Sequence, residues 1–293
     1  MDDTTLWTAE SVPIQGLGLM RLTDDGWGDD ERDPGLLVHA AVEAGVTLLD
    51  TAEMYGNEEL VGRAVAAHRD RVTLCSKFGV YWGPSGRFDD WSVRADPATV
   101  RTAIEGTLRR LDVDTVDLYY LHHRSDETPI EDTVEAMADL RRAGKIRALG
   151  LSNVTVDYVR RAHAVHPIAA VQQEWSVAKR DVEAMMPVLA ELGIALVAHS
   201  PMGHGTLTKA REDPVAQALA RIATHYDATP GQVALAWVHS RGRRSGQTVI
   251  PLPGTTRIAH LAANVAAARL TISDTDLDHL DAVVTETHEA GAV

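Results

Sequence analysis

Eight short apolar runs alternate with longer segments of helical spacing along this chain, and no other feature constrains its fold as strongly. The runs are bounded by Gly, Pro, Asp or Asn, which is typical of buried β-strands. The predicted strands span residues 17–20, 46–50, 72–77, 116–122, 147–152, 169–172, 195–200 and 249–251.

Between these runs the apolar residues recur at the helical period. Asp96-Pro97 is a good helix entry, because an N-cap residue precedes a proline at the first helical position, and Ala44-Gly45 is a good exit. The predicted helices span residues 35–44, 58–69, 97–111, 130–143, 156–164, 182–192, 214–226, 230–240 and 274–285.

Strands that are apolar on both faces and separated by helices predict parallel pairing through right-handed crossovers. Eight such units in one α/β chain of 293 residues indicate a (β/α)8 TIM barrel, with an open doubly wound sheet as the alternative. No composition shift or linker divides the chain, so we expect a single domain over residues 1–293. The segment 6–12 precedes the first strand and is placed to close the bottom of the barrel.

The net charge of −14 argues against nucleic acid or an anionic membrane as the main partner, because both require a basic surface. A small molecule is the better candidate, and the oligomeric state stays open. Cys75 is the only cysteine, which excludes an intrachain disulfide and fits a reducing compartment. The first residues carry no signal-peptide pattern, and no apolar run reaches membrane length, so a cytoplasmic protein is expected.

Four polar residues stand at or just after the ends of three predicted strands: Asp50, Tyr55, Lys77 and His122. In a (β/α)8 barrel these ends meet at one pocket. The Lys77 ammonium would stabilise a Tyr55 phenolate and so lower the Tyr55 pKa, while Asp50 orients the lysine. His122 would hydrogen-bond the reacting oxygen. A proton donor beside an oxygen-orienting group is what carbonyl reduction requires.

Each of these residues also has a structural explanation when taken alone. A lysine and an aspartate at strand ends often form a structural ion pair. The pair His122-His123 could bind a metal, but no carboxylate or third histidine lies at ligand spacing, so no metal site is expected. The joint occurrence of all four residues favours catalysis.

The motifs around these residues resemble those of the aldo-keto reductase superfamily, in its bacterial oxidoreductase branch. The resemblance runs from about residue 16 to 280 and implies a nicotinamide cofactor, NADP rather than NAD, with Asp50, Tyr55, Lys77 and His122 as catalytic tetrad. The motifs are Asp50-Thr-Ala-Glu-Met-Tyr-Gly56, Ser76-Lys-Phe-Gly79, Asp117-Leu-Tyr-Tyr-Leu-His122 and Gly150-Leu-Ser-Asn153.

The resemblance also implies cofactor contacts. Ser152, Asn153 and Gln172 match positions that hold the nicotinamide carboxamide, whose neutral groups suit amides and a hydroxyl. The remaining candidates, near the nicotinamide ring, pyrophosphate and adenosine, are His199, Ser200, Met202, Gly203, Gly254, Thr255, Arg257 and Asn264.

Three positions depart from the family pattern. His199 stands where an aromatic ring, often tyrosine, stacks on the nicotinamide. His260 replaces a frequent arginine and Ala263 a frequent glutamate near the adenosine. The segment after the seventh strand is also shorter than in many relatives, which predicts an open cleft.

Aromatic side chains gather on the loops that would form the substrate pocket. Such loops favour an apolar or sugar-like carbonyl substrate. Reduction of an aldehyde or ketone is the leading hypothesis, beside turnover of a bulky keto-sugar or polyketide intermediate, or a non-catalytic nicotinamide-sensing role. The candidate substrate contacts are Trp27, Trp82, Trp91 and His123.

Overall fold

Eight parallel strands form one barrel sheet in the computed structural model of the chain, which describes residues 6–7, 12–22, 33–85, 87, 89–207 and 213–289. The sheet closes where the Gly18 N–H donates to Pro253 O at 3.0 Å and Gly18 bridges to Gly254. The predicted (β/α)8 barrel is confirmed, and the open sheet is wrong. In spatial order the strands are β1 (Gly16–Gly18), β2 (Leu48–Asp50), β3 (Thr73–Phe78), β6 (Val116–Leu121), β7 (Ile146–Ser152), β8 (Ala170–Glu174), β9 (Ala195–His199) and β10 (Val249–Leu252).

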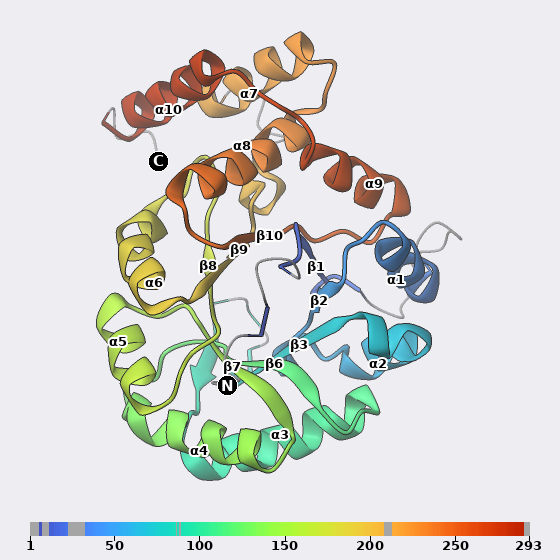
Figure 1. Cartoon of the computed structure of the whole chain (residues 1–293), viewed down its shortest axis with the longest axis vertical. Helices are drawn as coiled ribbons and strands as arrows, with labels where there is room; N and C mark the ends of the chain where they lie inside the picture. Colours follow the sequence, from blue (N-terminus) through green and yellow to red (C-terminus); the bar gives the residue numbers. More distant parts are fainter. Residues whose placement is uncertain are drawn as a thin grey trace.

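Helices surround the strands, and α7 and α10 lie outside α8 (Figure 1). Among the described residues, no helix is long and apolar enough to cross a membrane. The α-helices are α1 (Pro34–Glu43), α2 (Glu58–Val65), α3 (Pro97–Leu111), α4 (Ile130–Arg142), α5 (Val156–Val165), α6 (Met186–Leu192), α7 (Pro214–His225), α8 (Pro230–Ser245), α9 (Ile258–Ala267) and α10 (Asp274–Glu289).

The predicted helix signals operate as expected. Asp96 Oδ1 accepts hydrogen bonds from the N–H groups of Ala98 and Thr99, both at 3.0 Å, so the N-cap satisfies two unpaired donors of α3. Gly45 follows α1 with a φ of 81°, a left-handed conformation that glycine adopts readily. Helix α9 is an element that the sequence pattern did not predict.

Two apolar layers form the core. One lies between strands and helices, and the other fills the inside of the barrel. Trp7 packs into the inner layer with Leu48, Ala170 and Ala195, which are the first residues of β2, β8 and β9. The expectation that the segment 6–12 closes the bottom of the barrel therefore holds for Trp7, while residues 8–11 lie outside the described part of the chain.

A short antiparallel hairpin follows β3, formed by β4 (Val80–Trp82) and β5 (Trp91–Val93). The sequence predicts loops of the substrate pocket, and no strands, around Trp82 and Trp91. Val80 is buried against the barrel, and Trp82 pairs across the hairpin with Trp91. The hairpin gives the aromatic rim a defined backbone.

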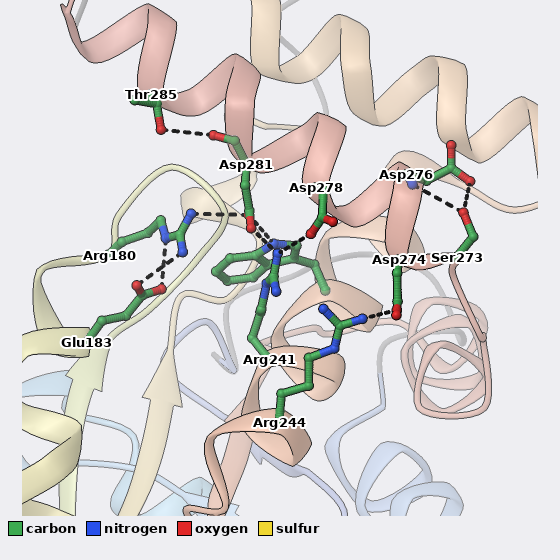
Figure 2. A network of polar contacts seen from close by, with 11 residues as sticks. Arg180, Glu183, Arg241, Arg244, Ser273, Asp274, Asp276, Asp278, Asp281 and Thr285 are labelled. Atoms are coloured by element: carbon green, nitrogen blue, oxygen red, sulfur yellow. Dashed lines mark hydrogen bonds and ion pairs between the residues drawn. The ribbon is translucent and has the colours of Figure 1, made fainter.

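Several carboxylates of α10 contact neighbouring elements, and that of Asp281 has the most partners (Figure 2). It accepts hydrogen bonds from Trp237 Nε1 at 2.9 Å and from Arg180 Nη1 at 3.1 Å, and it also pairs with Arg241. These partners come from α8 and from the chain after β8. The C-terminal helix is thus joined to two separate parts of the barrel wall.

Candidate active site

A cavity of about 430 Å³ lies at the carboxyl ends of the barrel strands. Asp50 is the last residue of β2, His122 directly follows β6, and Tyr55 belongs to η2 (Glu53–Tyr55), the short 3-10 helix after β2. The predicted residues that line the cavity are Asp50, Tyr55, Trp82, His122, Ser152, Asn153, Gln172, His199, Ser200, Met202 and Gly254.

A larger groove of about 740 Å³ lies outside the barrel, between α3 and the β4–β5 hairpin. Its lining includes Glu53, Tyr81 and Arg110 but none of the strand-end residues. Because the reactive groups converge on the smaller cavity, we place the candidate active site there.

Lys77 contacts two other members of the predicted tetrad, Asp50 and Tyr55. Its ammonium forms an ion pair with Asp50 Oδ1 and donates to Thr51 O at 2.9 Å and Tyr55 Oη at 3.4 Å. The side chains of Lys77 and Asp50 are only 1% and 3% exposed. Burial lowers the Lys77 pKa, but Asp50 and Tyr55 raise it more, so the net pKa lies above the ordinary value and the ammonium form is maintained.

The expected lowering of the Tyr55 pKa is wrong in this structure. Burial raises the pKa of Tyr55 above its ordinary value, and the nearby Lys77 charge only partly offsets the effect. Asp50 raises it further. Tyr55 is therefore a neutral phenol at physiological pH, ready to donate a proton.

His122 faces Tyr55 edge-on, with ring centroids 5.7 Å apart. Burial lowers the pKa of His122 well below its ordinary value, and the charges of Lys77, His199 and His123 lower it further. The imidazole is therefore neutral. Its Nδ1 is buried and has no hydrogen-bond partner within the described chain.

Two predicted cofactor residues brace the tetrad. Gln172 Nε2 donates to Asp50 Oδ2 at 2.9 Å. Asn153, in a left-handed conformation with a φ of 54°, donates from Nδ2 to His122 O at 3.0 Å and to Ser152 Oγ at 3.1 Å. These amides hold the strand ends together while they line the cavity.

A polar chain runs from His199 along the segment after β9. His199 Nδ1 and Ser200 Oγ are 3.1 Å apart, Ser200 Oγ lies 3.3 Å from His204 Nδ1, and His204 Nε2 lies 3.3 Å from Glu174 Oε1. Burial, with smaller contributions from Lys77 and His204, lowers the pKa of His199 to about 3. His199 therefore presents a neutral ring to the cavity.

The other cofactor candidates are not part of the cavity lining. Gly203 forms a turn with a φ of 58°. Thr255 Oγ1 accepts from the Arg257 N–H at 3.1 Å, at the start of α9, and Asn264 is buried within that helix. Gly203 and Thr255 are sequence neighbours of the lining residues Met202 and Gly254, whereas Arg257 and Asn264 belong to the start and the interior of α9.

The substrate candidates separate into three groups. Trp82, 41% exposed, lines the cavity and donates from Nε1 to Met54 O at 2.9 Å. Trp91 and His123 lie outside the lining and contact each other, with ring centroids 4.9 Å apart. Trp27 lies outside the described residues.

The cavity also contains residues that sequence reasoning did not identify. Met20 and Arg21 follow β1, Met54 precedes Tyr55, and His204 belongs to the segment after β9. The first three stand at strand ends or within a named motif, so their positions were detectable. The predicted open cleft stays a prediction, because residues 208–212 lie outside the described chain.

Comparison with known proteins identifies a family and several structural relatives. The profile of the Aldo/keto reductase family matches residues 16–285. An aldo/keto reductase from Klebsiella pneumoniae, crystallised with NADP and acetate, is 30% identical, with a TM-score of 0.77 over 97% of this chain and 96% of that one.

Two further solved structures have the same fold. An aldo-keto reductase from Bacillus halodurans, in its holo form, is 26% identical, with a TM-score of 0.76 over 92% of this chain and 91% of that one. A glycerol dehydrogenase from Gluconobacter oxydans is 24% identical, with a TM-score of 0.82 over 98% and 96%. The resemblance extends over nearly the whole of each protein.

Proposed function

The chain belongs to the aldo/keto reductase family, and on this premise we propose that it reduces an aldehyde or ketone to an alcohol with NADPH. The observation that carries the proposal is the contact of one buried ammonium, that of Lys77, with both Asp50 and Tyr55. This contact supports the proposed roles of Tyr55 as proton donor, Lys77 as its charged neighbour and Asp50 as the orienting carboxylate.

The residues at the cavity fit a nicotinamide dinucleotide. Ser152, Asn153 and Gln172 offer neutral polar groups suited to a carboxamide. At Gly254 a Cβ atom would lie 3.3 Å from Gly18 O, so glycine there allows β1 and the segment after β10 to approach closely at the edge of the cavity. The Klebsiella relative with NADP supports NADP as the cofactor, as does Arg257. When bound, the cofactor supplies the hydride.

The chain's own residues handle the proton. In reduction the Tyr55 Oη would transfer its proton to the substrate oxygen, leaving a phenolate that the Lys77 ammonium stabilises. Neutral His122 would hold the substrate oxygen by a hydrogen bond. The raised Tyr55 pKa keeps the phenol protonated at physiological pH, which is the form that reduction requires.

A bulky keto-sugar or polyketide intermediate is the alternative substrate. The partly exposed Trp82 ring in the cavity lining supports it, because an aromatic face can pack against a large substrate. For a nicotinamide-sensing protein without turnover, the buried Lys77–Tyr55 contact would have no purpose, and we do not favour that role.

The test follows NADPH absorbance with a panel of aldehydes and ketones, beside Tyr55→Phe. We expect kcat to fall by roughly 10²–10⁴-fold while NADPH binding is retained, because only the proton donor is lost. Tyr158→Phe, on α5, is the matched control and should keep full activity. Cofactor binding without turnover of any carbonyl by the wild type would favour the sensor, and equal activity of Tyr55→Phe would reject the proton-donor role.

A further inference from the structure

The helix that carries Tyr55 depends on contacts from outside the barrel. The 3-10 helix η2 has only three residues and no side-chain N-cap. Trp82 of the hairpin holds the carbonyl of Met54, and the Glu53 side chain turns toward α3. The two residues before Tyr55 thus tie η2 to the hairpin and to α3.

Arg110, in the last turn of α3, lies between two carboxylates. Its Nη2 is 2.6 Å from Glu58 Oε2 and 3.6 Å from Glu53 Oε1, and its Nε donates to Glu58 at 2.7 Å. Glu58 is buried at the start of α2. A Cβ atom at Gly106 would lie 2.7 Å from Arg110 Nη1, so glycine at that position makes room for the guanidinium.

Glu58 extends the network to the strand that carries Lys77. Ser76 Oγ donates to Glu58 Oε1 at 2.5 Å on the outer face of β3. Because side chains alternate along a strand, the next residue, Lys77, points into the barrel. One guanidinium thus contacts the carboxylates that hold η2 on one side and β3 on the other.

We propose that Arg110 is a positioning residue that, through Glu53 and the Glu58–Ser76 contact, keeps Tyr55 Oη within hydrogen-bond distance of Lys77 Nζ. The proposal rests on the proposed function, in which Lys77 stabilises the Tyr55 phenolate. The separation of 3.4 Å is already at the long end for a hydrogen bond, so a small displacement of η2 would break it.

The charges around the network favour the arginine in this role. Burial raises the pKa of Glu53, the Arg110 charge lowers it, and the Glu58 charge raises it again. Glu53 also neighbours Tyr81, whose pKa it raises, after burial, to about 12. Without the guanidinium, two partly or fully buried carboxylates would repel each other beside η2.

Glu53→Gln is the first test, because it keeps the shape of the side chain and leaves the Arg110–Glu58 ion pair intact. We expect kcat to fall about tenfold with an unchanged KM for NADPH, since misplaced catalytic groups cost rate more than binding. Gly106→Ala is the second variant. It displaces the guanidinium without removing a charge, and alanine favours the helix, so a lower kcat there is not a sign of poor folding.

A second readout does not depend on turnover. The groups that face Tyr55 are Lys77, Asp50 and His122, and the charges that act on its pKa are those of the first two. In Glu53→Gln the weaker Lys77 contact should raise the Tyr55 pKa. NMR of carbon-13-labelled tyrosine, with Tyr55 assigned from Tyr55→Phe, measures this even if the protein reduces no carbonyl.

Arg109→Met is the matched control, because Arg109 is the exposed neighbour of Arg110 on the same groove. It should leave kcat and the Tyr55 titration unchanged. If Glu53→Gln and Gly106→Ala lower only the melting temperature, with kcat and the Tyr55 pKa as in the wild type, Arg110 is merely structural and the proposal is wrong. If the wild type lacks turnover but the Tyr55 pKa still shifts, the proposed function fails and the positioning role stands.

Discussion

Gln172 donates its amide to Asp50 Oδ2 at 2.9 Å, while the other oxygen of the same carboxylate pairs with Lys77. Each oxygen of this buried side chain therefore has a separate partner. The orientation of the carboxylate is fixed from β8 as well as from β3, and Lys77 is held where it can reach Tyr55.

Replacing Gln172 with Met should lower the free energy of unfolding by about 1–3 kcal/mol, because Asp50 Oδ2 loses its donor in a buried site. We also expect a lower kcat, since the carboxylate can rotate. Urea unfolding and steady-state kinetics measure the two effects. Gln173→Met is the control: Gln173 donates to Val154 O at 2.7 Å, so stability should fall while kcat is retained. Equal kinetics of the two variants would contradict the positioning of Asp50 by Gln172.

Lys77→Met should destabilise the protein by about 3–5 kcal/mol, because it leaves the Asp50 charge buried without its partner. The double variant Asp50→Asn/Lys77→Met removes both charges and should recover most of that loss. Neither variant should reduce carbonyls. Chemical denaturation of the wild type, the two single variants Asp50→Asn and Lys77→Met, and the double variant measures these stabilities. A double variant as unstable as Lys77→Met would contradict the electrostatic explanation.

Acid should destabilise the fold through two histidines whose pKa values are lowered in the folded state. Burial lowers the pKa of His199 to about 3 and that of His239 to about 4. In the unfolded chain each histidine titrates near pH 6.5, so below about pH 6.5 the unfolded state binds more protons than the folded state. The free energy of unfolding therefore decreases as the pH is lowered from about 6.5 to the pKa of the folded state. His199→Phe should reduce the slope by up to about 1.4 kcal/mol per pH unit. Urea titrations at several pH values measure it, with exposed His260→Gln as the unchanged control.

Asp281→Ala should lower the free energy of unfolding by about 1–3 kcal/mol, because Trp237, Arg180 and Arg241 lose a shared acceptor. Asp278 contacts the same Arg241 at 3.5 Å but is 70% exposed. Asp278→Ala should therefore change the free energy of unfolding by less than about 0.5 kcal/mol. Hydrogen exchange should show faster opening of α10 in the first variant only. Similar exchange in both would mean that Asp281 does not fasten the helix.

The sequence was sufficient to predict the order of the strands along the chain and the barrel. Apolar runs bounded by Gly, Pro, Asp or Asn reflect strands that are buried on both faces. The sequence does not predict α9, because this alanine-rich helix starts without a side-chain N-cap. It missed the β4–β5 hairpin because three-residue strands leave little alternation to detect. The predicted ends of some strands also differ from the observed ends: β1 ends at Gly18 rather than at Met20.

The convergence of Asp50, Tyr55 and His122 on one cavity followed from strand ends in a barrel. The direction of the Tyr55 pKa shift could not be predicted. It depends on whether burial or the Lys77 charge has the larger effect, and the extent of burial is set by side-chain packing. The Arg110 network was equally hidden, since it joins residues from α2, α3 and η2 whose spacing along the chain carries no signal.

The hydrogen bond from Gly18 to Pro253 joins segments more than two hundred residues apart, at the lip of the cavity. Contacts of such sequence separation are slow to form, because nearly the whole chain must be ordered before the loop can close. A nascent chain that has not yet released β10 from the ribosome has no complete cavity. The onset of cofactor affinity during refolding would therefore report the last step of barrel closure.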